Sequence, residues 1–154
     1  MSDLEQRLQT LEAESAIRKL KAQYLNACDA KDPQAIRACF IEDAVIDYPP
    51  LGEFNLDGLI KIFTDMAVNT NIVDTHQAHN AEISIDGDTA TAKWNFSYSM
   101  YNPDSKNYRL LAAFYHDKYQ KTDDGWLISY TRSEPRSVVD GSLDGDVKGN
   151  WIKA

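Results

Sequence analysis

Apolar side chains recur every three to four residues along the first part of the chain, which predicts a long N-terminal helix. These positions are Leu4, Leu8, Leu11, Ile17, Leu20, Tyr24, Leu25 and Cys28. Ser2 or Asp3 is expected to cap the start of this helix. The stretch 4–11 is thin in apolar residues and rich in charge, so we expect it to form an arm that packs on a partner chain.

Two shorter helices and one short strand are predicted next. Asp32-Pro33 is an N-cap followed by proline at the first helical position, which predicts a second helix. Residues 44–48 are expected to form a strand that Pro49-Pro50 ends. Asp57 is expected to cap a third helix. The apolar positions of the two helices are Ile36, Cys39 and Phe40, and then Leu59, Ile60, Phe63 and Val68.

From about residue 75 the apolar period changes to two, which is typical of strands. Turn sequences at 86–88, 102–104 and 123–125 divide this region. They leave four predicted strands, over residues 75–85, 90–100, 108–122 and 126–138. Tight turns between long neighbouring strands predict an antiparallel meander. Residues 139–154 are expected to form an irregular tail, and Trp151 and Ile152 are candidates to dock over a pocket.

This order, with helices first and a meander after, predicts an α+β fold. A curved sheet folded against a long helix encloses a cone. We expect a pocket inside it, lined by the apolar face that carries Trp94, Phe96 and Tyr98. Residues 110–115 are apolar on both faces, which predicts cover on both sides of the sheet. No repeat or long linker divides the chain, so a single domain is expected over residues 1–154.

Composition narrows the possible partners. The net charge of -8 argues against a nucleic-acid partner, which would need clustered Lys and Arg. No apolar run approaches the roughly 20 residues of a membrane span. The acidic, helical N-terminal segment differs from a signal peptide, so a cytoplasmic protein is expected. Cys28 and Cys39 are too few for a disulfide framework and are expected to be buried free thiols.

Tyr24, Asp29 and His76 are the polar residues that stand out as candidates for chemistry. A histidine held by a carboxylate is a general base, and a tyrosine hydroxyl polarises a carbonyl group. A structural histidine, and Asp29 as a cap of the following turn, remain open alternatives. The chain has no nucleotide-binding or metal-protease motif. His76, His79 and Asp74 suggest a metal site, but residues three apart on a strand face opposite ways, so no metal or cofactor is expected.

Strand alternation bears on which side chains enter the pocket. With Ile83 and Ile85 inward, a regular strand places His79 inward and His76 outward. His76 therefore reaches the pocket only if a bulge or bend precedes Ile83. Arg132 follows Trp126 and Ile128 in alternation and is expected to reach the cavity. His116 is expected on a solvated face, and Tyr48 near the pocket mouth.

Three stretches resemble the SnoaL-like group of the nuclear-transport-factor-2-like superfamily. They are IRKLKAQYLNACDAKD at 17–32, THQAHNAEISIDGDTATAKW at 75–94 and FYHDKYQKTDDGWLI at 114–128. The resemblance covers nearly all of the chain up to about residue 138. It implies a cone-shaped, cystatin-like fold. In character the chain is similar to bile-acid 7α-dehydratase, scytalone dehydratase and hexachlorocyclohexane dehydrochlorinase, which carry out eliminations without a cofactor by means of a His–Asp pair.

Carried over by position, the resemblance implies Asp29 as the family's aspartate and His76 as its base. It implies Tyr24 as the first-helix tyrosine of the dehydratases, and it favours His76 over His79. One position departs from the pattern. The bile-acid enzyme has an acidic residue where this chain has Tyr98, which puts that enzyme's substrate and reaction in doubt. Tyr98 is a candidate either to hydrogen-bond a carbonyl or hydroxyl group or to form an aromatic wall.

The resulting hypothesis is a cofactor-independent lyase or isomerase. His76 and Asp29 abstract a proton from a small apolar cyclic compound of steroid or polyketide type, and Tyr24 or Tyr98 stabilises the enolate. Tyr48, Trp94, Phe96, Tyr98 and Arg132 are the expected substrate-binding residues. A non-catalytic binding module and a structural subunit are the alternatives, because one fold serves many functions. A homodimer or homotrimer is expected, since an exposed apolar sheet face is a liability.

Overall fold

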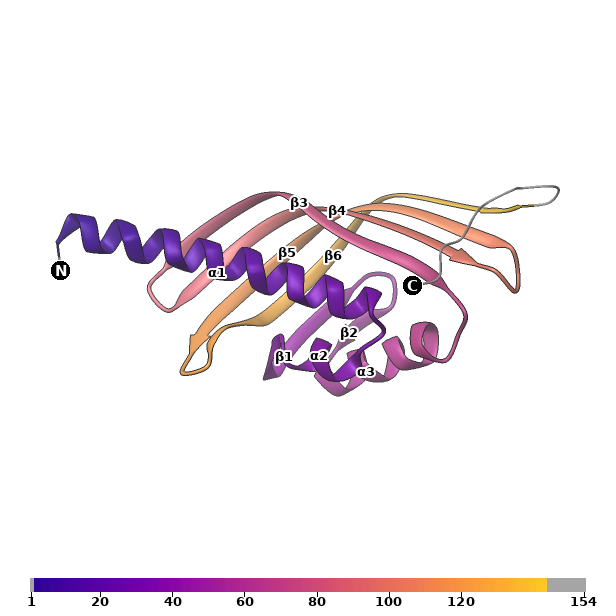
Figure 1. The fold of residues 1–154 in the computed structure, drawn as a ribbon, viewed down its shortest axis with the longest axis horizontal. Coiled ribbons are helices and arrows are strands. Elements are labelled where there is room, and N and C mark those ends of the chain that lie inside the picture. Colours follow the sequence, from indigo (N-terminus) through magenta and orange to yellow (C-terminus); the bar gives the residue numbers. More distant parts are fainter. Residues whose placement is uncertain (1, 144–154) are drawn as a thin grey trace.

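The computed structural model describes residues 2–143 and begins with the long helix α1 (Asp3–Asp29). Ser2 caps it, and a capping box with Glu5 satisfies backbone donors at the helix start. Its buried stripe begins at Ala13 and continues through Ile17, Leu20, Tyr24 and Cys28. The first turns project beyond the β3–β4 hairpin, and Leu4, Leu8 and Leu11 are exposed there (Figure 1).

The segment after α1 differs in several details from the prediction. Helix α2 (Pro33–Arg37) has its N-cap at Asp32, as predicted. Phe40 does not lie on that helix but begins strand β1 (Phe40–Tyr48), which is four residues longer than expected. A short strand, β2 (Gly52–Phe54), follows the Pro49–Pro50 turn and was not predicted. Its three residues are too few to show an alternating pattern, and it forms by pairing with β1.

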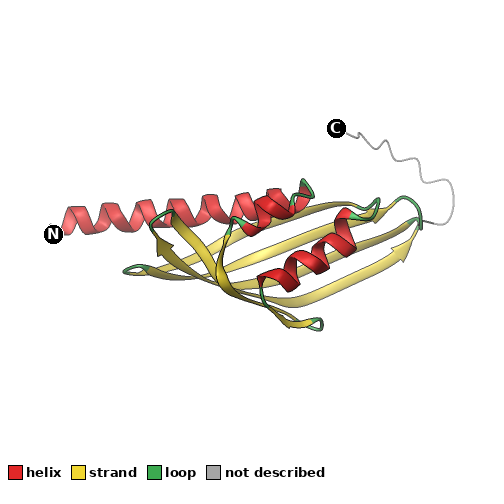
Figure 2. Cartoon of the chain, turned by 90° about the horizontal axis from the view of Figure 1, so that it is seen from below, coloured by secondary structure: helices red, strands yellow, loops and turns green. Residues whose placement is uncertain are grey.

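Helix α3 (Leu56–Phe63) is capped by Asn55, not by Asp57, because the Asn55 side chain accepts a hydrogen bond from the Gly58 backbone N–H. The helix continues as a π-helical turn, η1 (Thr64–Val68). In Figure 2 this helical segment lies apart from α1, at the other side of the molecule. Within residues 2–143, no helix combines the length and apolar composition needed to cross a membrane.

A curved six-stranded sheet supports the helices, in the order β2-β1-β6-β5-β4-β3. The four long strands are β3 (Val73–Asp86), β4 (Thr89–Asn102), β5 (Asn107–Thr122) and β6 (Gly125–Ser142). They form the predicted antiparallel meander. The sheet is mixed, however, because β1 pairs in parallel with β6. This α+β arrangement confirms the predicted fold class apart from that one parallel pair.

Strand β6 extends further than expected. It pairs with β5 as far as Ser142, and a bidentate Arg109–Asp140 contact joins the two strands near this end. The tail that was predicted to be irregular from residue 139 is therefore a strand over its first four residues. The expected docking of Trp151 and Ile152 lies outside the described residues.

The inner face of the sheet packs on α1 and carries the core, while the outer face turns away from it. Core residues include Ile17, Ile46, Tyr119 and Ile128. A buried ion pair joins Lys21 of α1 to Asp117 of β5 at 2.8 Å. Cys28 and Cys39 are buried free thiols, as predicted; burial raises the pKa of Cys28 to about 12 and that of Cys39 to about 11. Both thiols therefore act as apolar core groups rather than as nucleophiles.

Candidate functional site

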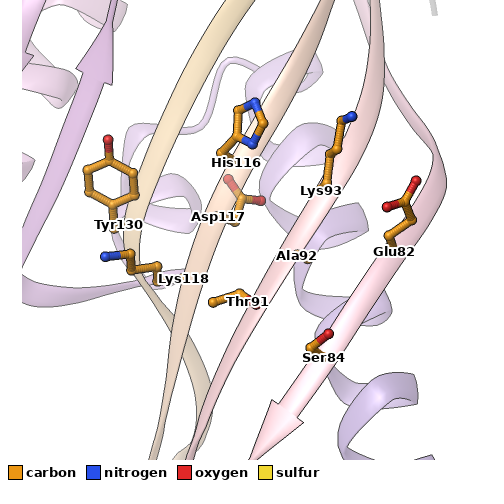
Figure 3. Close-up of a pocket in the computed structure, with 9 residues that line it drawn as sticks. All are labelled: Glu82, Ser84, Thr91, Ala92, Lys93, His116, Asp117, Lys118 and Tyr130. Carbon is orange, nitrogen blue, oxygen red and sulfur yellow. The ribbon is translucent and has the colours of Figure 1, made fainter.

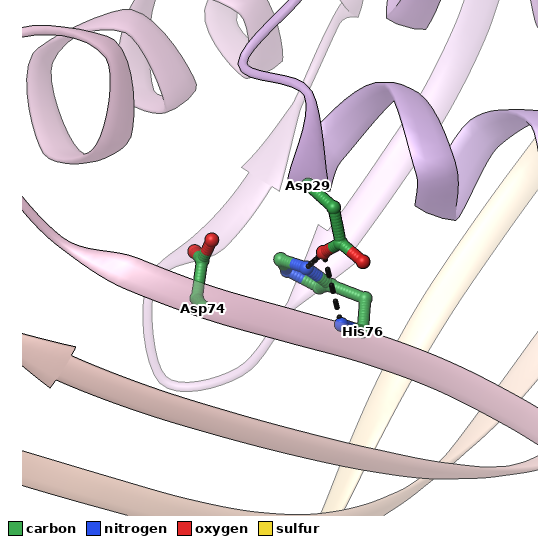
Figure 4. Close-up of side chains that lie close together, drawn as sticks. All are labelled: Asp29, Asp74 and His76. Atoms are coloured by element: carbon green, nitrogen blue, oxygen red, sulfur yellow. Dashed lines mark hydrogen bonds and ion pairs between the residues drawn. The ribbon is translucent and has the colours of Figure 1, made fainter. Parts of the chain in front are cut away.

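Asp29 and His76 form a hydrogen-bonded pair at the C-terminal end of α1. Asp29 Oδ1 lies 2.7 Å from His76 Nδ1 and also accepts the backbone N–H of His76 at 3.0 Å (Figure 4). Strand β3 is the last strand of the sheet, with β4 on one side only. The His76 backbone N–H lies on the open side, where Asp29 takes the place of a neighbouring strand. The carboxylate thus holds both the main chain and the ring of one residue.

The contact with Asp29 fixes the chemistry of the imidazole. A carboxylate only accepts hydrogen bonds, so in the neutral ring Nδ1 carries the proton and Nε2 keeps a lone pair. Among residues 2–143, no hydrogen bond to Nε2 is present. The His76 side chain is 15% exposed and that of Asp29 29%, so the pair is sheltered but reachable. This arrangement suits a general base.

A β-bulge brings His76 to the inner face. The register shifts between His79 and Glu82, and Asn80 adopts a positive φ of 53°. Before the bulge, His76 pairs with Tyr98, and after it Ile83 pairs with Ala92. The bulge that sequence alternation required for His76 is therefore present. His79 is exposed and contacts Ser97 Oγ at 3.2 Å.

Two tyrosines of the predicted site are paired with each other. Tyr24 and Tyr48 are hydrogen-bonded at 2.9 Å, so the chain brings the predicted first-helix tyrosine together with the end of β1. Burial is the main cause that raises the pKa of both hydroxyls above the ordinary tyrosine value. Both therefore keep their protons at neutral pH and can donate hydrogen bonds.

Aromatic rings of β4 flank the histidine. The Phe96 ring centroid lies 5.9 Å from that of His76, and the Tyr98 centroid lies 4.7 Å from it. The two β4 rings are also stacked on each other at 6.5 Å. These contacts place Phe96 and Tyr98 beside His76, as the alternation of the strand predicted.

Trp94 lies on the predicted inner face of β4 and borders a crevice together with His76, whereas Arg132 differs from its predicted position. Trp94 is buried in the core, where its indole N–H donates to the Tyr119 hydroxyl at 3.0 Å. Arg132 lies on the outer face, paired with Asp47 of β1. A bulge at Ser129 causes this, because it reverses the alternation between Ile128 and Tyr130. Arg132 therefore does not reach the site.

Two residues of this region were not predicted as site residues, Asp74 and Lys31. The Asp74 carboxylate accepts one hydrogen bond from the Lys31 ammonium and another, at 3.3 Å, from the Tyr98 hydroxyl. Lys31 follows α1 with a positive φ of 58°. The only sequence signal was the two-residue spacing of Asp74 and His76, which places both side chains on one face of β3.

Asp29, Asp74 and His76 are also the group that comes nearest to a metal site. One potential ligand atom of each lies within 4.8 Å of the others. The Lys31 ammonium already neutralises Asp74, however, and His76 Nδ1 is engaged with Asp29. Asp74 and His76 therefore already have hydrogen-bonding partners within the protein.

One surface hollow borders His76, and another lies on the outer face of the sheet. A crevice of about 230 Å³ between α1 and β3 is bordered by Arg18, Asn26 and His76. A hollow of about 320 Å³ lies on the outer face, where Lys93, His116 and Lys118 line it, with the helices behind the sheet (Figure 3). His116 is paired there with Glu134, which agrees with its predicted solvated position. His76 and His116 therefore lie on opposite faces of the sheet.

Comparison with known proteins agrees with the fold. A family model described as the SnoaL-like domain matches residues 9–132. An uncharacterised protein of Mycobacterium tuberculosis is 29% identical over 116 residues, which cover 73% of this chain and 78% of the relative.

Three solved structures are similar. A candidate scytalone dehydratase from Novosphingobium aromaticivorans superposes with a TM-score of 0.78 at 19% identity, over 87% of this chain and 91% of that one. Hexachlorocyclohexane dehydrochlorinase type 3 from Novosphingobium barchaimii gives 0.79 at 16% identity, over 96% and 99%. A nuclear-transport-factor-2-like protein with a cystatin-like fold, also from N. aromaticivorans, gives 0.67 at 20% identity, over 94% and 90%.

Proposed function

The chain belongs to the SnoaL-like family, and from that premise we propose that it is a cofactor-independent lyase or isomerase of the dehydratase type. The observation that carries this proposal is the 2.7 Å contact between Asp29 and His76 Nδ1, which leaves Nε2 as the basic atom. Two of the similar structures bear the names of elimination enzymes, a dehydrochlorinase and a dehydratase. This likeness in name supports the reaction class.

In the proposed reaction, His76 Nε2 removes a proton from a carbon next to a carbonyl group. The C–H electron pair forms the enolate double bond, and Asp29 stabilises the imidazolium that results. In an elimination, the enolate electrons then form the new C=C bond, and the hydroxyl on the neighbouring carbon takes the proton back from the His76 imidazolium and leaves as water. In an isomerisation, His76 returns the proton to another carbon.

The Tyr24–Tyr48 pair is the proposed enolate stabiliser. Tyr24 and Tyr115 both hydrogen-bond to Tyr48, and when each donates to the Tyr48 oxygen, the Tyr48 proton remains to be donated to a ligand. The raised pKa of both groups keeps that proton in place. Tyr98 is less suited to this task, because its hydroxyl donates to Asp74.

The substrate class follows from the rings beside His76. Phe96 and Tyr98 present flat apolar faces, which fit a small cyclic compound of steroid or polyketide type.

We include in the proposal the predicted cytoplasmic location and the absence of nucleic-acid and membrane partners. The single-domain organisation over residues 1–154 is likewise part of it.

The test measures proton abstraction directly. Exchange of the α-hydrogens of hydroxylated cyclic ketones in D₂O is followed by NMR, and loss of water by mass spectrometry. His76→Ala is expected to slow exchange by about 10²–10⁴-fold, which is the usual contribution of a positioned base. His79→Ala, on the exposed side of the same strand, is the matched control and should retain wild-type exchange. Equal exchange rates in His76→Ala and wild type would contradict the proposal.

A structural or non-catalytic subunit is the second candidate, favoured by exposed apolar groups. Leu4, Leu8 and Leu11 project from α1, and Leu110 and Val139 lie exposed on paired positions of β5 and β6. Such groups are typical of surfaces that another chain covers. Both candidate functions are compatible with the predicted homodimer or homotrimer. A sedimentation measurement that finds only monomer would exclude that assembly.

A further inference from the structure

Asp74 is a second carboxylate at the site, on the opposite side of His76 from Asp29. Its side chain is only 3% exposed and lies two residues before His76 on the same face of β3 (Figure 4). A buried carboxylate without a partner is costly, and two groups provide partners here. They are the Lys31 ammonium and the Tyr98 hydroxyl, which lies 3.3 Å from Asp74 Oδ2.

These contacts determine where the Tyr98 proton points. A phenol carries one proton and two lone pairs, whereas an ionised carboxylate only accepts. The Lys31 ammonium donates a hydrogen bond to the other oxygen of Asp74. The Tyr98 proton is therefore committed to Asp74, and burial together with the Asp74 charge raises the pKa of Tyr98. Toward any ligand beside His76, the Tyr98 oxygen offers lone pairs alone.

We propose that Asp74 is a positioning residue that fixes Tyr98 as a hydrogen-bond acceptor, so that the site selects cyclic compounds bearing a hydroxyl group over those bearing only ether or carbonyl oxygens at that place. This inference rests on the proposed function, since it concerns a ligand held beside His76. It names the role of Tyr98, which takes the position of a relative's acidic residue.

The test uses two matched ring compounds, 2-naphthol and 2-methoxynaphthalene, which differ in one hydroxyl proton. Binding to the full-length protein is measured by calorimetry. The wild-type protein is expected to bind the naphthol about tenfold more tightly, as one hydrogen bond of ordinary strength provides. Tyr98→Phe, which removes the acceptor, is expected to bring the ratio of the two dissociation constants to about one.

Two further variants act on the positioning groups and leave Tyr98 in place. In Asp74→Asn the side-chain amide can donate to Tyr98, which frees the phenol proton for the ligand. Lys31→Gln removes, at a partly exposed position, the ammonium that holds the Asp74 carboxylate, so that Asp74 is less firmly placed against the Tyr98 hydroxyl. Both variants are expected to lower the naphthol preference at least threefold. Circular dichroism checks that each variant is folded. If one of the two variants does not fold, the other still tests the proposal.

The outcomes separate this inference from the proposed reaction. His76→Gln should abolish hydrogen exchange in ketones but retain the tenfold naphthol preference, because Tyr98 and Asp74 are unchanged. A preference that persists in Tyr98→Phe, or in both Asp74→Asn and Lys31→Gln, overturns the role of Asp74. A wild-type protein that binds both compounds equally, or neither, also overturns it, whatever the result of the exchange assay.

Discussion

Two histidine–carboxylate pairs lie on opposite faces of the same sheet. On the inner face His76 Nδ1 meets Asp29 at 2.7 Å, and on the outer face His116 Nε2 meets Glu134 at 2.8 Å. The distances are nearly equal, but the surroundings differ. The inner side chains are 15% and 29% exposed, the outer ones 41% and 48%.

This difference shows that a short contact alone does not identify a catalytic base. His76 has aromatic rings beside it and a carboxylate that also holds its backbone. His116 has an exposed partner whose pKa its hydrogen bond lowers, as in an ordinary surface ion pair. What distinguishes the inner pair is shelter from water, which strengthens charge interactions and orients a substrate.

The largest expected effect comes from removing the carboxylate charge of the inner pair, compared with the same change in the outer pair. Asp29→Asn is expected to lower the rate of ketone hydrogen exchange by about 10²–10⁴-fold, because a neutral amide does not stabilise the imidazolium that forms. The asparagine oxygen can still accept the His76 backbone N–H, so the fold should persist. NMR exchange rates measure the effect.

The matched control for this substitution is Glu134→Gln on the outer face. It makes the same chemical change beside His116 and should leave the exchange rate within about twofold of wild type. If both variants lose activity equally, the two faces are not functionally different. If neither loses activity, Asp29 acts only as a cap for the edge of β3.

The second effect concerns stability and compares two lysines that each lie over an aromatic ring. Lys21 Nζ lies 3.7 Å from the Tyr115 centroid on the inner face, and Lys93 Nζ lies 4.2 Å from the Phe114 centroid on the outer face. Lys21→Met leaves the buried Asp117 charge without its partner and is expected to cost about 3–5 kcal/mol in the free energy of unfolding. Lys93→Met should cost less than about 1 kcal/mol.

Urea denaturation measures both values, and a double variant tests the cause. Lys21→Met with Asp117→Asn removes both charges while Tyr119 and Thr131 keep hydrogen-bonding residue 117. It should recover a large part of the lost stability. A double variant as unstable as Lys21→Met alone would show that packing of the lysine chain, rather than the uncompensated charge, causes the loss.

Sequence periodicity predicted the elements with long, regular patterns. The α1 helix, the four strands of the meander and the Asp32 cap depend on local spacing, which a sequence records directly. The parallel pairing of β1 with β6 and the three-residue β2 depend on contacts between distant segments, and no local pattern reports them. Phe40 illustrates this limit, since its apolar side chain fits a helix stripe and a strand equally well.

Bulges decided on which face of the sheet the candidate side chains lie. Alternation required a bulge before Ile83 for His76 to face inward, and the structure has one at Asn80. No signal required the bulge at Ser129, so Arg132 was assigned to the wrong face. Asp74 and Lys31 were not assigned to the site because their contact joins residues 43 positions apart, at a turn whose direction the sequence did not reveal.

The smallest expected effect tests the Asn80 bulge, which separates the inner histidine from its outer neighbour His79. Asn80 holds a positive φ of 53°, a conformation that asparagine and glycine tolerate and β-branched residues do not. Asn80→Gly should therefore change stability by only a few tenths of a kcal/mol, whereas Asn80→Val should cost about 1–2 kcal/mol. If valine instead forces β3 into regular alternation, His76 turns outward, and ketone exchange falls as far as it does in His76→Ala. Urea denaturation together with the exchange assay separates local strain, which lowers stability alone, from a change of face, which abolishes activity. Wild-type values of both quantities in Asn80→Val would show that this bulge does not set the direction of His76.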